Sequence, residues 1–259
     1  MDPPEALGAI ERDVVACRRC PELRAYCARI ATEKRRAYTE WTYWAKPVPA
    51  FGDPNARVLL VGLAPGAHGS NRTGRMFTGD ASGEWLYRAL ARSGFANQPQ
   101  ATDRNDGLVL HDALITAAAR CAPPHNKPTP QQLRRCAPFL DAEVHTLTRL
   151  RVVVGLGAIG TRAAYDALTR CGFNFAERPS FAHLAETVAC EDSGEHRCIV
   201  LLASYHPSRQ NTNTGKLTEP MLDAVFARVR NILAVQGGGA EERRLVSQRS
   251  RNRKRGGRT

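Results

Sequence analysis

The sequence predicts an α/β fold in which short buried strands alternate with helices. The segment Arg57–Leu63 (RVLLVGL) is short, aliphatic and bounded by turn residues, and Arg151–Gly155 (RVVVG) has the same character. Such runs are typical of strands that are buried on both faces of a parallel sheet. Each run is followed by a glycine-containing stretch and a helical pattern, and open α/β folds bind ligands at such strand ends.

The loop between Val61 and Asp80 (VGLAPGAHGSNRTGRMFTGD) is the strongest candidate for a binding site. Its glycines allow the backbone to approach a ligand closely. A loop of this length is uncommon in a compact domain unless it is functional, although an ordinary strand-to-helix connection is the alternative. Asp80 or Ser82 can cap the helix that we expect to begin near Gly83.

The composition is that of a globular protein with a charged end. The 259 residues are 42% hydrophobic, and no segment approaches the length of a membrane span. The first residues lack the apolar core of a signal peptide, so we expect a cytoplasmic protein with no membrane partner. The formal net charge is +12, and residues 243–259 carry eight Lys or Arg and no acidic residue.

This charge distribution divides the chain in two. We expect residues 1–235 to form a single domain and residues 236–259 to form a disordered basic tail. A basic tail attracts phosphates independently of sequence, so we interpret it as a nucleic-acid arm. A purely solubilising tail is the alternative.

Two cysteine pairs predict a metal centre. Cys17 and Cys20 form a C-x2-C pair, Cys121 ends a strand-like run, and Cys136 lies in a helix capped by Thr129. Without a signal peptide, eight cysteines argue against a disulfide framework. Four thiolates could tie the N-terminal segment to the core, but they do not separate zinc from an iron–sulfur cluster. We expect the other cysteines to be buried small residues, namely Cys27, Cys171, Cys190 and Cys198.

Two further patterns each have competing interpretations. Gly155, Gly157 and Gly160 spell the G-x-G-x-x-G fingerprint of a dinucleotide-binding oxidoreductase. The fingerprint also needs an acidic residue at the end of a later strand, but Glu177 lies in FNFAERPS, which does not resemble a buried strand. Tight helix packing therefore explains the glycines better. Between Arg35 and Phe51, aromatic and basic residues alternate, which suits either a DNA-facing surface or a core.

His206 has the most favourable setting for a proton or hydrogen-bond donor. It follows the strand pattern Arg197–Ala203, which we expect to pair with Glu186–Cys190, and it begins a loop rich in hydroxyl and amide groups. We expect Leu217–Leu233 to form a closing amphipathic helix.

Four features together resemble the uracil-DNA glycosylase superfamily, and specifically its iron–sulfur-containing fifth family. These are GLAPG at 62–66, GRMFTGD at 74–80, HPSRQNTNTG at 206–215 and the spacing of the paired cysteines. The resemblance spans Cys17–Leu233. It implies a three-layer α/β/α sandwich around a four-stranded parallel sheet. It also implies a [4Fe-4S] cluster on Cys17, Cys20, Cys121 and Cys136.

The resemblance implies a monomeric DNA repair enzyme, associated with the nucleoid, that excises uracil from DNA, with hypoxanthine and xanthine as further candidate bases. A base inside a duplex is unreachable, so the nucleotide is flipped into a pocket before its N-glycosidic bond is hydrolysed. Phe77 would stack on the base, and His206 would stabilise the departing anion. The pocket loop comprises Gly62, Leu63, Ala64, Pro65 and Gly66. The residues implied to hold phosphates are Ser208, Arg209, Gln210 and Asn211.

The group that positions the water is not obvious, because Leu63 and Ala64 are apolar where related families carry an acid or an amide. The resemblance offers Asp80 and Asn126 as replacements. Thr116 stands where a relative carries a base-reading Asn, so we expect a broader base range. A non-catalytic metal-containing DNA-binding module is a further alternative, and it predicts DNA binding that does not depend on His206.

Overall fold

The computed structural model describes residues 2–191 and 197–235, so the predicted basic tail at 236–259 lies outside the described residues. The strands form one sheet with the order β1-β3-β2-β4-β7-β6-β5. Their bounds are β1 (Phe51–Gly52), β2 (Val58–Gly62), β3 (Ala113–Ala117), β4 (Val152–Leu156), β5 (Phe173–Phe175), β6 (Glu186–Glu191) and β7 (Cys198–Ser204).

The predicted α/β fold is confirmed, but the predicted four-stranded parallel sheet is too narrow. Four neighbouring strands, β3, β2, β4 and β7, are parallel. The sheet is extended by antiparallel β1 beside β3 and by antiparallel β6 and β5 beyond β7. The described sheet is therefore mixed and has seven strands.

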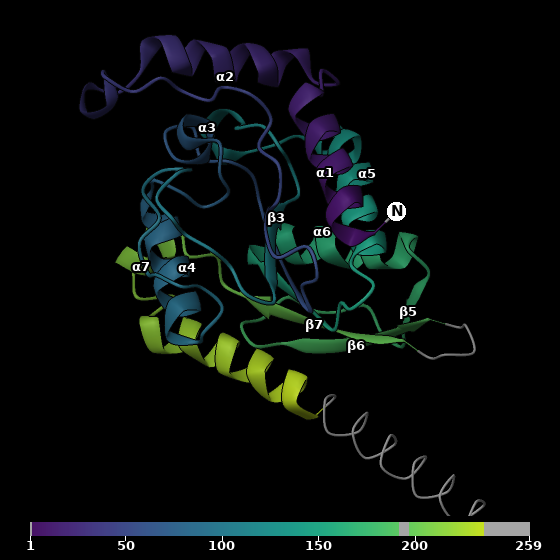
Figure 1. The fold of residues 1–259 in the computed structure, drawn as a ribbon. Coiled ribbons are helices and arrows are strands. Elements are labelled where there is room, and N and C mark those ends of the chain that lie inside the picture. The colour runs from purple at the N-terminus through teal and green to yellow at the C-terminus, as the bar shows by residue number, and fades with distance from the viewer. Residues whose placement is uncertain (1, 192–196, 236–259) are drawn as a thin grey trace, which may run out of the picture.

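Helices cover both faces of this sheet (Figure 1). Their bounds are α1 (Pro3–Ala16), α2 (Pro21–Glu33), α3 (Ser70–Thr73), α4 (Ala81–Arg92), α5 (Pro130–Thr146), α6 (Gly157–Arg170), α7 (Arg209–Asn213) and a C-terminal helix at 219–235. Short 3-10 turns lie at Arg36–Tyr38 and Pro124–Asn126. Across the described residues, no helix combines the length and the apolar character that crossing a membrane requires.

The side chains of the buried strands alternate between the two faces of the sheet, and this alternation creates the three layers. Val58 and Leu60 of β2 belong to the core that contains α4 and the helix at 219–235. Leu59 and Val61 of the same strand belong to the opposite core, with α5 and α6. Successive side chains of a strand point to opposite faces, so one short aliphatic strand contributes to two cores. Helix α1 packs outside α5 (Figure 1).

The predicted helix caps are confirmed. The Asp80 carboxylate accepts a hydrogen bond from the Gly83 amide at 3.0 Å and caps α4, which begins at Ala81. Thr129 caps α5 in a reciprocal capping box with Gln132. Each cap satisfies backbone N–H groups that have no partner within the helix, and so fixes where the helix begins.

The glycine motif at 155–160 serves packing. A side chain at Gly155 would overlap Thr161, and one at Gly160 would overlap the carbonyl oxygen of Val61. Helix α6 can therefore approach the sheet closely only because these positions lack a Cβ. Glu177 lies outside the strands, two residues beyond the end of β5. The geometry gives no support to the dinucleotide-binding alternative.

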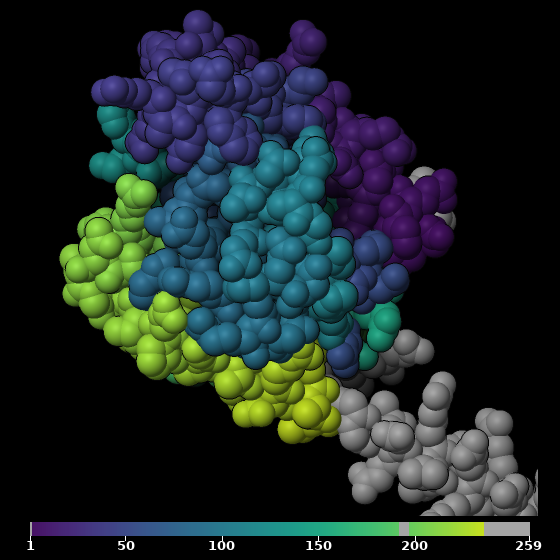
Figure 2. All heavy atoms as spheres, turned by 60° about the vertical axis from the view of Figure 1, so that its left-hand side comes forward, coloured from purple at the N-terminus to yellow at the C-terminus, as the bar shows by residue number. Residues whose placement is uncertain are grey.

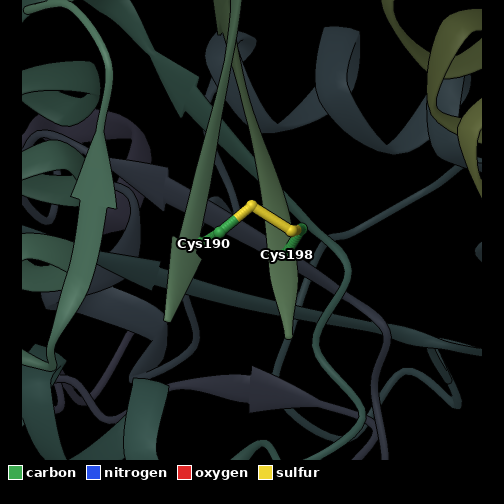
Figure 3. Close-up of a disulfide and its surroundings, with 2 residues drawn as sticks. All are labelled: Cys190 and Cys198. Atoms are coloured by element: carbon green, nitrogen blue, oxygen red, sulfur yellow. A yellow bond between two sulfur atoms is a disulfide. The ribbon is translucent and has the colours of Figure 1, made fainter. Parts of the chain in front are cut away.

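Cys190 and Cys198 form a disulfide between β6 and β7 (Figure 3). The two residues are direct partners in the antiparallel register, and their Cα atoms lie 4.1 Å apart. The prediction that both cysteines are unpaired buried residues is therefore wrong. Their pairing depends on strand register, which the sequence of a short hairpin does not determine.

We predict that Gly160→Ala destabilises the protein, although Ala is normally the better helix former. The new methyl group must displace the sheet backbone, which we expect to lower the free energy of unfolding by about 1–3 kcal/mol. Gly8→Ala in α1 is the matched control, because its methyl would lie 3.6 Å from the flexible Arg12 side chain. That control should be stabilising. Urea unfolding measures both, and equal stabilisation would contradict the packing role.

Candidate functional site

A cavity of about 740 Å³ opens where the carboxyl ends of β2, β4 and β7 meet. Leu63 follows β2, Leu156 ends β4 and Tyr205 follows β7, and all three line the cavity. Residues at the starts of α4 and α7 also line the cavity. The helices α4 and α7 lie side by side in Figure 1, and the same parts of the chain are adjacent blue and light green surfaces in Figure 2. Open α/β folds bind ligands at this end of the sheet.

The structure brings most of the predicted site residues to this cavity. The predicted residues that line it are Leu63, Ala64, Gly66, Phe77, Asp80, Asn126, His206, Ser208, Arg209, Gln210 and Asn211. Gly62 and Pro65 are buried behind this lining. A Cβ on Gly62 would lie 2.7 Å from the ring of Phe77, so the absent side chain at Gly62 leaves room for that ring.

Phe77 is held in an unusual backbone conformation. Its φ is +52°, in the left-handed region that residues with a Cβ rarely adopt. Its carbonyl lies against Gly83, where any Cβ would overlap it. The Phe77 ring lies 5.7 Å from the imidazole of His206, centroid to centroid, with 30° between the planes. The surrounding structure thus maintains a strained residue on the cavity wall, as is typical of functional sites.

Asp80 is both a helix cap and part of the cavity wall. One carboxylate oxygen, Oδ1, accepts the Gly83 amide hydrogen, whereas Oδ2 faces the backbone of Gly66 and Gly69. Burial raises the pKa of Asp80 above its ordinary value, opposed by the Gly83 and Ser82 amides and by the charge of Arg209. Glycine at 66 and 69 leaves the space that the second oxygen needs.

His206 is a neutral imidazole at pH 7. Burial lowers the pKa of His206 to about 4. The Asn211 side-chain amide donates to the His206 carbonyl at 2.8 Å, and Gly157, with φ +81°, leaves room for the His206 side chain, because a Cβ there would lie 3.1 Å from the Cβ of His206. These contacts position an N–H donor that needs no positive charge.

Two residues singled out from the sequence have settings that differ from the rest. Asn126 lines the cavity but is exposed, in a turn where its φ is +55°. Thr116 is buried, and its hydroxyl donates to Glu143 at 2.8 Å, next to the Arg120–Glu143 ion pair. The Thr116 hydroxyl therefore ties β3 to α5.

Arg72 was not predicted, yet it supports the candidate loop. Its guanidinium lies 4.0 Å from the ring centres of both Tyr38 and Trp41 and is only 4% exposed. Its Nε donates to the His68 carbonyl at 2.8 Å and its Nη2 to the Gly79 carbonyl at 2.9 Å. The aromatic residues between Arg35 and Phe51 thus include a structural clamp. Two members of this stretch, Arg35 and Tyr38, also line the cavity.

Five free cysteines lie in or between the N-terminal helices α1 and α2, in the segment after β3 and in α5. Cys20, Cys27 and Cys121 pack in one buried cluster, and burial raises the pKa of the nearby Cys136 to about 11. Cys17 is half-buried at the end of α1. Among the described residues, no three His, Cys, Asp or Glu side chains converge closely enough to hold a single metal ion. Free buried thiols are nevertheless the donors that iron–sulfur clusters use.

The family model of the uracil DNA glycosylase superfamily matches residues 49–230. The chain belongs to this superfamily. It is 47% identical over 224 residues to the type-5 uracil-DNA glycosylase of Thermus thermophilus, covering 86% of this chain and 97% of that protein. The type-5 uracil-DNA glycosylase of Mycobacterium bovis is 42% identical, with 86% and 80% covered, and that of Pyrobaculum aerophilum is 43% identical, with 83% and 88% covered. The superfamily resemblance is therefore confirmed.

We predict that the buried neutral state of His206 makes stability depend on pH. An unfolded histidine titrates near 6.5, so the unfolded chain binds the extra proton as pH falls from about 6.5 towards 4. Stability from the neutral imidazole is therefore present above about pH 6.5 and lost below it. Urea unfolding at pH 7 and pH 5 should show a smaller loss in His206→Asn than in the wild type. The exposed His145→Asn variant controls for removal of a surface imidazole; identical losses in all three proteins would contradict the prediction.

Proposed function

We propose that the protein is a uracil-DNA glycosylase that hydrolyses the N-glycosidic bond of a flipped nucleotide and leaves an abasic site in DNA. The main support is one cavity wall that joins Phe77 and Asp80, from the loop before α4, to His206, from the loop after β7. The type-5 names of the similar proteins support the same substrate. Incubation with uracil-containing DNA, followed by alkaline cleavage at abasic sites, tests the activity directly.

His206 and Phe77 would act on the departing base. When the glycosidic bond breaks, uracil leaves as an anion and the sugar approaches an oxocarbenium ion. A fixed N–H donor aimed at the forming anion lowers the barrier, because it interacts more strongly with the anion than with the neutral base. His206 offers such a donor, and the adjacent Phe77 ring gives the flat surface on which the base can stack.

Asp80 would orient the attacking water. The adjoining loop residues Leu63 and Ala64 line the cavity with apolar groups, whereas Asp80 brings a carboxylate to it. Among the described lining residues, Asp80 carries the only carboxylate. Asn126 is the second candidate, although its exposed position at the rim suits it less well to hold an ordered water.

The segment Ser208–Asn211 would hold the DNA strand. Ser208 caps α7, Arg209 and Gln210 line the cavity, and Asn211 fixes the His206 backbone. Action on DNA would place the protein at the nucleoid. A base range that includes hypoxanthine or xanthine is supported by the lack of a base-reading amide at Thr116, whose hydroxyl is bonded to Glu143.

The cysteines Cys17, Cys20, Cys121 and Cys136 would hold a [4Fe-4S] cluster. When bound, the cluster would supply a structural cross-link, because its ligands come from the α1–α2 junction, the segment after β3 and α5. The buried thiols of Cys20, Cys121 and Cys136 favour this assignment, since metal binding offsets the cost of burying a thiolate.

We predict that Asp80→Asn slows single-turnover uracil release by about 10²- to 10⁴-fold, because positioned acid–base groups contribute that much to rate. Asn caps helices about as well as Asp, so α4 should remain intact. Thr129→Ala, which removes a cap from α5 outside the cavity, should lower stability by about 1 kcal/mol without slowing release. If a folded Asp80→Asn variant releases uracil at a near-normal rate, Asp80 does not orient the attacking water and Asn126 becomes the candidate for that role.

We predict that Cys136→Ser loses iron, sulfide, visible colour and stability together. The matched control is Cys171→Ser, because Cys171 donates to the Asp141 carbonyl and lies outside the cysteine cluster. That variant should keep its iron. Anaerobically purified wild type would be assayed for metal and acid-labile sulfide, and stoichiometric zinc without iron would rule out the cluster.

A further inference from the structure

An aromatic ledge adjoins the mouth of the cavity. The rings of Phe181 and His183 both lie next to the Tyr205 ring, with centroid distances of 6.0 Å for Phe181 and 5.1 Å for His183. The ammonium of Lys216 lies 5.0 Å from the centre of the Tyr205 ring. Three of these residues, Phe181, Tyr205 and Lys216, line the cavity, and Tyr205 directly precedes His206.

The backbone holds this ledge firmly. The Tyr205 amide donates to Nδ1 of His183, so the other ring nitrogen, Nε2, carries the proton and donates to the Met221 carbonyl at 3.2 Å. Backbone hydrogen bonds join Leu184 and Ala185 to Ala203 at the end of β7. The segment that carries Phe181 is therefore fixed to the same strand end as His206.

Two large apolar side chains that line the cavity, Phe181 and Ile159, are exposed, and of the two only Phe181 is aromatic. It is 40% exposed, and its neighbour Leu184 is 39% exposed but does not line the cavity. The charge of the rim points to a polyanion. The described lining residues include four Lys or Arg, namely Arg35, Lys127, Arg209 and Lys216, against the single carboxylate of Asp80.

We propose that the exposed ring of Phe181, held beside Tyr205, stacks on the nucleobase next to the one that enters the cavity, on the same DNA strand. This proposal rests on the proposed function. Aromatic rings stack on any base, and a nearby cation can meet the phosphate that joins two nucleotides. Lys216 supplies such a cation next to Phe181's neighbour Tyr205, because its ammonium lies 5.0 Å from the centre of the Tyr205 ring.

The test compares two single-stranded oligonucleotides that both carry 2′-fluoro-2′-deoxyuridine, a uracil nucleotide that resists hydrolysis. In the first, the neighbouring nucleotides keep their bases; in the second, they are abasic spacers. Phe181→Ala should weaken binding of the first about tenfold, which corresponds to one stacked base. It should leave binding of the second unchanged. Fluorescence anisotropy measures both affinities.

Two variants separate stacking from general damage. Phe181→Tyr keeps a ring and should bind both oligonucleotides like the wild type, and Leu184→Ala controls for loss of an exposed apolar group on the same segment. Equal effects of Phe181→Ala on the affinities for the two oligonucleotides, or no effect on either affinity, would contradict the proposal that Phe181 stacks on the neighbouring base. Failure of wild-type protein to excise uracil would instead refute the proposed function.

Discussion

The buried cation of Arg72 is the interaction on which the candidate site depends. A guanidinium removed from water must find acceptors, because an uncompensated buried charge is strongly unfavourable. The carbonyls of His68 and Gly79 supply them, and the rings of Tyr38 and Trp41 pack against the guanidinium. Since Gly79 directly precedes Asp80, the clamp connects the N-terminal segment to the carboxylate proposed for chemistry.

A second buried arginine holds the other part of the same loop. Arg75 forms a bidentate ion pair with Asp106 and donates to the Thr78 hydroxyl. Burial opposes ionisation of Asp106, but Arg75 and backbone amides outweigh it and hold the pKa of Asp106 below its ordinary range. The two residues that directly follow Phe77 are held by these arginines, Thr78 by Arg75 and Gly79 by Arg72, so the chain is fixed immediately after the positive φ of Phe77.

Local patterns in the sequence predicted the elements that are buried, capped or rich in glycine. The aliphatic strands, the caps at Asp80 and Thr129 and the close packing of α6 all follow from local chemistry. Long-range pairings were not predictable in this way. The short edge strands have too few residues for a pattern, the Cys190–Cys198 disulfide depends on register, and the Arg72 clamp joins residues some thirty positions apart. The motifs located the cavity wall, but they did not indicate that Gly62 and Pro65 lie behind it.

At Phe77, the left-handed backbone conformation lowers stability, whereas the ring of the same residue serves the proposed activity. Glycine would relieve the strain there, since it adopts positive φ without a steric cost. The same change would remove the ring that faces His206. A library selected only for heat resistance would therefore tend to accept glycine at position 77, whereas a library selected for repair of damaged DNA would retain an aromatic residue. Such opposed preferences would make position 77 diagnostic of the pressure under which a variant arose.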